Sequence, residues 1–193
     1  MTPLSRENLF SLEQYAEKRP EFRAQVIEHK KHRRVDIGDN LSLYFEDRLT
    51  IQYQVQEMLR IERIFEADAI QEELDAYNPL IPDGSNLKCT AMLEFEDVAV
   101  RKERLAQLVG VENLVWLQVN GFDKVHAIAN EDLDRSTDEK TSAVHFMRFE
   151  LSDDMKGALR NGAALTFGTD HAGYPYTSEV PEETRQALIE DLA

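Results

Sequence analysis

Cysteine is almost missing from this 193-residue chain, which has only Cys89. One thiol cannot form an internal disulfide, and no Cys-x-x-Cys pair is present to bind zinc or an iron–sulfur cluster. Cys89 falls on the apolar side of an alternating segment. We therefore expect a buried, unreactive thiol and not a nucleophile.

Long hydrophobic runs are also missing, and none approaches the roughly 20 residues that a membrane-spanning helix needs. The first residues lack the basic start and apolar core of a secretory signal. We therefore expect a cytoplasmic protein without a membrane partner. Gly-x-Gly-x-x-Gly, P-loop and Gly-x-Ser-x-Gly motifs are absent too. This weakens the case for nucleotide-dependent or serine-hydrolase chemistry, and no organic cofactor is predicted.

Positive charge is scarce, with 22 Lys and Arg against 37 Asp and Glu and a formal net charge of −15. An acidic protein repels a phosphate backbone, so we expect no nucleic-acid partner. The exception is the basic run at residues 29–34. It could bind an anion or an acidic partner, or it could be a solvated helix end whose dipole favours cations. The candidate partner-binding residues are Lys30, Lys31, Arg33 and Arg34.

The length suits one domain, and we expect residues 1–193 to form one. Residues 1–80 have a mainly helical pattern, residues 87–170 a mainly stranded one, and residues 181–193 a closing helix. We predict an α+β fold, with N-terminal helices packed on an antiparallel sheet formed mainly by the C-terminal half. That sheet would have about four to six strands.

Apolar spacing predicts the helices. Two are expected before residue 31, over residues 5–18 and from Pro20 onward, because proline suits a first helical turn. The strongest helix is expected over residues 48–65, followed by another over residues 68–78. The stripe of the strongest helix consists of Ile51, Val55, Met58 and Phe65.

Alternating apolar residues predict the strands, which are expected over residues 41–45, 87–95, 114–119, 122–129, 141–151 and 163–169. Between the third and fourth strands, Asn120-Gly121 is typical of a type I′ hairpin turn, whose two central residues both have positive φ. A short helix is expected near residues 153–160, and the last helix over residues 181–192.

Glu62 stands out because it occupies a position on the apolar stripe of the strongest helix. A buried carboxylate must be paired, protonated or metal-bound. It could therefore fix helix packing through an Arg or Tyr, or it could be a general acid/base or metal ligand. Glu57 and Arg60 belong to the same helix, and Arg60 can reach Glu57 three residues earlier.

Two histidines in the stranded half complete the candidate polar residues. His145 shares a strand face with Met147 and Phe149, so it is either a hydrogen-bonded core imidazole or a ligand. His171 follows a strand, where site residues often gather, and neighbouring Asp170 could orient an imidazole. If these residues met in space, they would suit a divalent metal or acid–base chemistry. The candidate catalytic residues are Glu57, Arg60, Glu62, His145 and His171, and the candidate metal ligands are Glu57, Glu62, Glu94, His145 and His171.

Several longer strings have a family resemblance. They are Lys-Lys-His-Arg-Arg-Val at residues 30–35, Gln-x-Gln-Glu-Met-x-Arg-x-Glu at 54–62, Glu-Leu-x-x-Tyr-Asn-x-Leu-Ile-Pro at 73–82 and Ala-Val-His-Phe-x-Arg-Phe at 143–149. Together with Asp-His-x-x-Tyr at 170–174, they resemble a bacterial family called domain of unknown function 3501 (DUF3501). The resemblance covers nearly the whole chain.

The resemblance implies a gene that neighbours those of a rubrerythrin-like protein and an iron–sulfur oxidoreductase. It therefore implies a role near peroxide handling or electron transfer. Any cluster would belong to the partner, because this chain lacks the cysteines, and it also lacks the paired Glu-x-x-His motifs of a ferritin-type di-iron centre.

Two hypotheses follow from the sequence and the resemblance. The first is an accessory protein that docks an oxidoreductase and takes part in an oxidative-stress system. The second is a small metal-binding protein or enzyme with a Glu/His site. A homo-oligomer is compatible with either.

Overall fold

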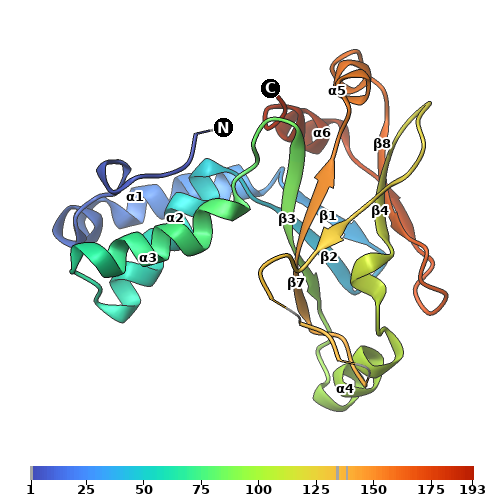
Figure 1. The fold of residues 1–193 in the computed structure, drawn as a ribbon, viewed down its shortest axis with the longest axis horizontal. Helices are drawn as coiled ribbons and strands as arrows, with labels where there is room; N and C mark the ends of the chain where they lie inside the picture. The colour runs from blue at the N-terminus through green and yellow to red at the C-terminus, as the bar shows by residue number, and fades with distance from the viewer. Residues whose placement is uncertain (1, 134, 138) are drawn as a thin grey trace.

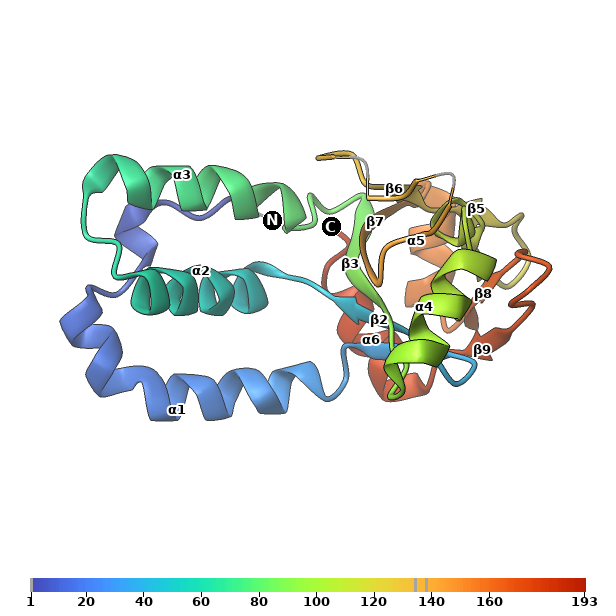
Figure 2. The ribbon, with the colours of Figure 1, turned by 90° about the horizontal axis from the view of Figure 1, so that it is seen from below.

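The computed structural model describes residues 2–133, 135–137 and 139–193. Three N-terminal helices lie to one side of a β-sheet region (Figure 1, Figure 2). They are α1 (Leu12–Lys30), α2 (Arg48–Glu62) and α3 (Ala67–Tyr77), and we call them the arm. The predicted α+β class, with helices toward the N-terminus and strands largely in the C-terminal part, is confirmed.

The two helices expected before residue 31 are one continuous helix, α1, with Pro20 inside it. Ser11 caps the start of the helix, and its side chain accepts a hydrogen bond from the Gln14 amide at 3.2 Å. Pro20 removes one backbone hydrogen bond. However, Tyr15 and Phe22 on either side of it contact each other edge-on, with ring centroids 6.2 Å apart. Phe22 also lies 6.0 Å from the Tyr53 ring of α2, so the helix is packed against its neighbour beside Pro20.

The other two arm helices begin and end close to their predicted positions. The Asp47 side chain caps α2 by accepting from the Thr50 amide at 2.9 Å. Helix α2 ends when Arg63 adopts a left-handed conformation, with φ of 55°. Helix α3 runs into a 3₁₀ turn, Asn78–Leu80, because Pro79 cannot continue an α-helix.

Within the described residues the strands form two antiparallel sheets, whereas one sheet was expected. The first sheet has the order β1-β2-β3-β7-β6, and the second has the order β5-β4-β8-β9. The strands of the first sheet are β1 (Arg34–Ile37), β2 (Leu41–Phe45), β3 (Asn86–Leu93), β7 (Val144–Glu150) and β6 (Ile128–Ala129). Those of the second are β5 (Val125–His126), β4 (Val115–Val119), β8 (Leu165–Thr169) and β9 (Thr177–Glu179).

The strand predicted over residues 122–129 is divided between the two sheets. Strand β5 pairs with β4, and β6 pairs with β7. Between them, the Ala127 amide donates to the Val115 carbonyl at 2.8 Å. The predicted type I′ turn is also wrong, because Gly121 has φ of 90° but Asn120 stays at negative φ. A longer connection with one positive-φ residue joins β4 to β5.

The main core lies between the two sheets and includes the rings of Phe45, Phe149 and Phe167. The ring centroid of Phe167 is 5.2 Å from that of Phe45 and 5.4 Å from that of Phe149. Cys89 is buried in this core, as predicted, and burial raises the pKa of its thiol. The arm has a separate apolar cluster, formed by Leu4, Ile51, Val55, Leu59, Leu74 and Ile81.

Along the described chain, three connections join the arm to the first sheet: α1 leads into β1, β2 into α2, and α3 into β3 through the 3₁₀ turn. The remaining helices are α4 (Val98–Gln107), α5 (Asp153–Arg160) and α6 (Glu182–Ile189). A 3₁₀ turn, Arg6–Asn8, precedes the arm, and another, Val111–Asn113, precedes β4. None of the helices described here is both long and apolar enough to cross a membrane.

Candidate functional site

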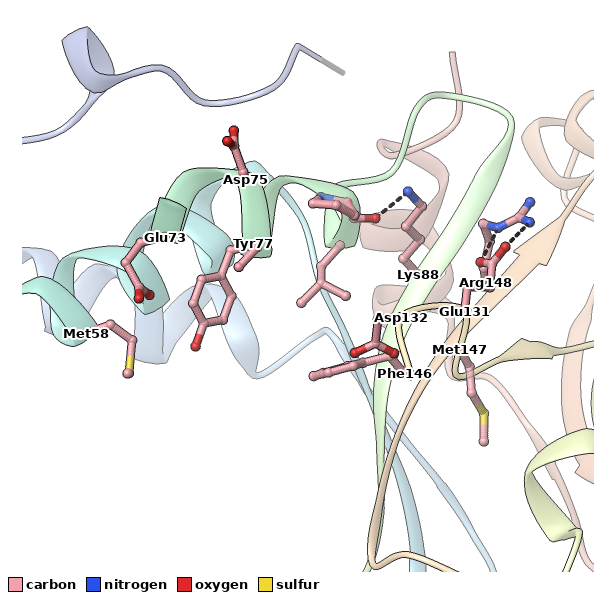
Figure 3. A pocket seen from close by; sticks show the side chains of 13 residues that line it. Met58, Glu73, Asp75, Tyr77, Lys88, Glu131, Asp132, Phe146, Met147 and Arg148 are labelled. Atoms are coloured by element: carbon pink, nitrogen blue, oxygen red, sulfur yellow. Dashed lines mark hydrogen bonds and ion pairs between the residues drawn. The ribbon is translucent and has the colours of Figure 1, made fainter. Parts of the chain in front are cut away.

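A groove lies between the arm and the outward face of the first sheet. It consists of two adjoining cavities, of about 640 Å³ and 490 Å³, that share Tyr77, Leu80 and Phe146 as lining residues. Figure 3 shows the larger cavity, with Tyr77 on the arm side and Phe146 on the sheet side. We call the two cavities together the groove.

The period-two alternation of the strands creates the floor of the groove. In β7, His145, Met147 and Phe149 are buried, whereas Val144 and Phe146 are only half-buried. Because successive side chains in a strand point to opposite faces, Phe146 faces away from the core between the sheets. Thr90 of β3 lies opposite Phe146 in the sheet, so the floor continues across both strands.

The end of α3 forms the arm side of the groove. Pro79 stops the helix, and the 3₁₀ turn that follows places Leu80 in the groove near Tyr77. The Asn78 side chain accepts from the Leu4 amide at 2.8 Å and donates to the Leu4 carbonyl at 2.9 Å. The Lys88 ammonium of β3 donates to the Pro79 carbonyl at 2.7 Å, which joins the turn to the floor (Figure 3).

The smaller cavity has a basic wall. Lys30, Lys31 and Arg34 line it, so three of the four predicted partner-binding cations lie at this end of the groove. Arg34 donates to Asp36 at 2.7 Å, and its guanidinium lies 5.2 Å from the centroid of the Tyr44 ring. Lys31 pairs with Glu28 at 2.5 Å, one helical turn earlier.

Arg33 does not belong to this wall, and the prediction that it contributes to a basic surface is wrong. Only 2% of Arg33 is exposed. Its guanidinium donates to the Phe45 carbonyl at 3.2 Å and pairs with Asp191 and Asp47. Alternate residues of an extended chain point to the same side. Val35 and Ile37 of β1 both point into the core, and Arg33 is the next residue of this alternate series. Its side chain is therefore directed inward.

The larger cavity is lined by carboxylates from both sides. Glu73 and Asp75 come from α3, and Asp132 follows β6. Burial raises the pKa of Glu73, and the nearby charges of Glu62 and Glu72 raise it further. This carboxylate therefore lies in a locally negative environment.

Glu57, the first catalytic candidate, is bound within the arm. It accepts from the Tyr15 hydroxyl and from Arg19 Nε, each at 2.7 Å, and from Arg60 at 3.2 Å. The expected pairing of Arg60 with Glu57 is confirmed. The Arg19 hydrogen bond, with those from Tyr15 and Arg60, lowers the pKa of Glu57 to about 2 although partial burial opposes this. The cluster holds α1 against α2.

Glu62 is exposed, so the prediction of a carboxylate buried on the apolar stripe is wrong. The buried stripe of α2 is Ile51, Val55 and Leu59, with a spacing of four. That face is rotated away from the face predicted from Met58 and Phe65. Glu62 is the last residue of α2, so no later turn of this helix covers its side chain, which projects into solvent.

His145 is 1% exposed, which confirms a hydrogen-bonded core imidazole. Asn130 Nδ2 lies 3.0 Å from its Nδ1, and the Ser142 carbonyl lies 3.0 Å from its Nε2. These contacts suit a neutral ring with the proton on Nε2. Burial lowers the pKa of His145, although the Glu112 carboxylate opposes this.

Glu112 is a buried carboxylate that the sequence patterns missed. It is 3% exposed, and its carboxylate oxygen lies 4.0 Å from His145 Nε2. Glu112 accepts from the hydroxyls of Ser136 at 2.5 Å and Thr141 at 2.9 Å. It lies in the 3₁₀ turn Val111–Asn113, which is too short to have a hydrophobic period. Together these contacts tie Asn130, Ser136 and Thr141 to His145 and Glu112.

His171 and Asp170 have separate partners. His171 Nδ1 accepts from the Gly173 amide at 3.1 Å, within its own turn. Asp170 accepts from Trp116 Nε1 at 3.0 Å and from Lys124 at 2.7 Å, and it lies 3.2 Å from His126 Nε2. Asp170 therefore orients His126, and the suggestion that it orients His171 is wrong, because adjacent side chains in an extended chain point in opposite directions.

The candidate residues are not brought together. Glu94 lies 3.8 Å from Arg34 and 3.4 Å from the Tyr44 hydroxyl, close to the basic wall. Glu57 is hydrogen-bonded to residues of α1 and α2, and His145 is buried on the core side of the first sheet. Among the residues that the structure describes, no three His, Cys, Asp or Glu side chains form a group that could hold a metal ion.

The geometry thus defines an α+β protein with a helical arm beside two sheets and a groove between them. The chain belongs to the family described as "Protein of unknown function (DUF3501)", whose sequence profile matches residues 3–192. This confirms the resemblance. A crystal structure of a novel protein of unknown function from Burkholderia pseudomallei K96243 is similar, with 52% sequence identity, a TM-score of 0.94 and full coverage of both chains. No curated protein matches the chain significantly.

Proposed function

We propose that this protein is a non-catalytic accessory protein whose groove binds a segment of a partner polypeptide. The observation that supports the proposal is the joining of two cavities by shared apolar residues, Tyr77, Leu80 and Phe146. Each cavity has a volume typical of a ligand site. Joined end to end, they suit an elongated occupant better than one compact small molecule.

The residues at the centre of the groove have the chemistry of a protein interface. Aromatic side chains and methionine are enriched at the centres of such interfaces, and charged residues at their rims. Tyr77, Phe146 and Met58 supply the apolar area, and the charged residues lie at the two ends. An apolar side chain of the partner inserted between Tyr77 and Phe146 would be the anchor of the complex.

The proposed partner is an iron–sulfur oxidoreductase or a rubrerythrin-like protein of the cytoplasm, as the resemblance implies. In this proposal the protein serves an oxidative-stress or electron-transfer system without holding a redox group. The alternative is a metal-binding protein or small enzyme with a Glu/His site. It has less support, because Glu57 and His145 are each bound to separate partners.

The test is co-expression with each proposed partner from the same organism, followed by co-purification and measurement of Kd. The groove variant carries Leu80→Ser and Phe146→Ser. The control carries Phe65→Ser, because Phe65 is 66% exposed and lies beyond α2, outside the groove. We expect the groove variant to weaken binding by about 2 kcal/mol or more, roughly thirtyfold in Kd, and the control to bind like the wild type. Binding of neither partner, or equal binding by all three forms, would overturn the proposal.

A further inference from the structure

From the charges at the two ends of the groove we infer that it binds a partner segment in one fixed order. In the bound segment, an acidic side chain of the partner lies beside Lys30 and Lys31. Apolar side chains of the partner lie between Tyr77 and Phe146, and a basic one lies beside Glu73. This inference rests on the proposed function and specifies the chemistry of the partner segment.

The basic end has cations that a partner can reach. The Lys31 side chain is 57% exposed, and its bond to Glu28 spans one exposed helical turn. Such exposed pairs contribute little and exchange partners readily. Lys30 forms no ion pair with any residue that the structure describes. Both ammonium groups are therefore available to a carboxylate of the partner.

One carboxylate, Glu46, also lines the basic end, but its oxygens are already engaged. It accepts from the Thr50 hydroxyl at 2.6 Å and from the Thr90 hydroxyl at 2.9 Å. These bonds join the start of α2 to the floor of the groove. Glu46 thus does not neutralise either lysine by a direct ion pair.

At the opposite end the cations are occupied and a carboxylate is available. Arg148 is bound by Glu131 at 2.8 Å and also by Glu150, and the Lys88 ammonium donates to the Pro79 carbonyl. Glu73 is half-buried, and no ion pair to it is present in the described part of the chain. A cation of the partner would relieve its repulsion from Glu62 and Glu72.

The middle of the groove supplies affinity, and the two ends supply orientation. Leu80 and Phe146 are apolar and can hold a segment in either direction. A reversed segment would place its carboxylate beside Glu73 and its cation beside Lys30. Because like charges placed together cost free energy, the reversed order is disfavoured even with the same apolar contacts.

The experiment is selection of linear peptides from a displayed library on the whole protein. We expect the selected peptides to share an acidic residue, an apolar stretch and a basic residue in one order. On the Lys30→Glu/Lys31→Glu variant we expect a basic residue in place of the acidic one. Peptides selected on the wild type should bind this variant, and separately Glu73→Lys, about tenfold more weakly. Lys102→Glu, on the exposed surface of α4, is the control and should leave the selection unchanged.

The outcomes separate this inference from the proposed function. Suppose the selected peptides lose binding to Phe146→Ser but show no order of charges, or keep their order on the lysine variant. The inference is then wrong, although the groove still binds polypeptide. If no selected peptide depends on Phe146, both the inference and the proposed function are wrong. Thermal unfolding of each variant shows whether it is folded before selection.

Discussion

Arg33 and Asp191 form a buried ion pair that joins the residue before β1 to the segment after α6. Arg33 also lies 3.4 Å from Asp47, whose side chain caps α2. Asp47 in turn lies 2.5 Å from His29 Nε2 near the end of α1. Segments far apart in the chain thus meet at the base of the arm, where two carboxylates, Asp47 and Asp191, share the Arg33 guanidinium.

The first prediction concerns the pH dependence of Asp191. Burial raises the pKa of Asp191 to about 6, although Arg33 opposes this, whereas an unfolded aspartate titrates near 4. The folded protein therefore holds a proton between these values that the unfolded chain has lost. Stability should fall as the pH rises through this window. We expect Asp191→Asn to remove this dependence.

Urea unfolding at a series of pH values checks this prediction. The unfolding free energy of the wild type, relative to that of Asp191→Asn, should fall by about 2–3 kcal/mol between pH 4 and pH 7. Glu190→Gln is the matched control, because Glu190 is the exposed neighbouring carboxylate. A difference that stays constant across the pH range would contradict the prediction.

The second prediction concerns Glu57, whose pKa lies at about 2 because Arg19, Tyr15 and Arg60 bind it. An unfolded glutamate titrates near 4.3. The stabilisation by Glu57 is therefore present above about pH 4.5 and lost as the pH falls toward 2. Glu57→Gln should cost about 1–3 kcal/mol at pH 7, because the buried Tyr15 hydroxyl and the Arg19 guanidinium lose their charged partner.

Acid unfolding followed by circular dichroism separates this effect from a general loss of charge. The matched control is Glu62→Gln, because Glu62 belongs to the same helix and is exposed. We expect the Glu62 variant to retain the wild-type acid transition and the Glu57 variant to have a shallower one. Identical transitions in the two variants would show that the bonds to Glu57 contribute nothing.

The third prediction compares one substitution at two glycines. A Cβ at Gly168 of β8 would overlap the Trp116 ring, whereas one at Gly157 of α5 would meet nothing within 4 Å. Gly168→Ala should therefore destabilise the protein by about 1–3 kcal/mol, because the buried ring must move. Gly157→Ala should stabilise it by about 0.5–1 kcal/mol, because alanine favours a helix. Shifts of the same sign in thermal unfolding would refute the comparison.

The fourth prediction concerns the hydrogen-bond network that joins His145 to Asn130, Thr141 and Glu112. His145→Ala should cost about 1–3 kcal/mol, because the half-buried Asn130 amide and the buried Thr141 hydroxyl both lose their contact with the imidazole. Arg135 and Lys140, which lie close in sequence to Ser136 and Thr141, should become more susceptible to trypsin. His126→Ala is the control, because the His126 side chain is 47% exposed. Equal rates of cleavage in both variants would disprove this role.

Local patterns predicted the helices and strands that depend on local interactions. Helix α5 lies over residues 153–160, where it was expected, because Ser152 caps it and its amphipathic pattern is complete. The interior proline of α1 and the division of residues 122–129 between two sheets were not predicted. Both depend on contacts with distant residues: Ile128 pairs with Arg148, and Phe22 of α1 packs against the Tyr53 ring of α2. Short segments therefore carry no sign of them.

The site was predicted only in part, for a similar reason. The basic wall was visible as a run of cations, but Arg33 turns inward because it shares the parity of Val35. The alternation of Arg33, Val35 and Ile37 can be read from the sequence, and it would have excluded Arg33 from the predicted basic surface. The pairing of Tyr77 with Phe146 across the groove was not visible, because 69 positions separate them and only the tertiary fold brings them together.

The three connections between the arm and the first sheet also bear on the speed of binding. A domain joined by a single linker can swing, but any swing here would have to bend three peptide segments at once. If the groove binds a partner segment as proposed, its width should be set before the partner arrives, and no closing step should precede binding. Association should therefore follow diffusion and orientation alone, at about 10⁵–10⁷ M⁻¹ s⁻¹, and rise as salt is removed.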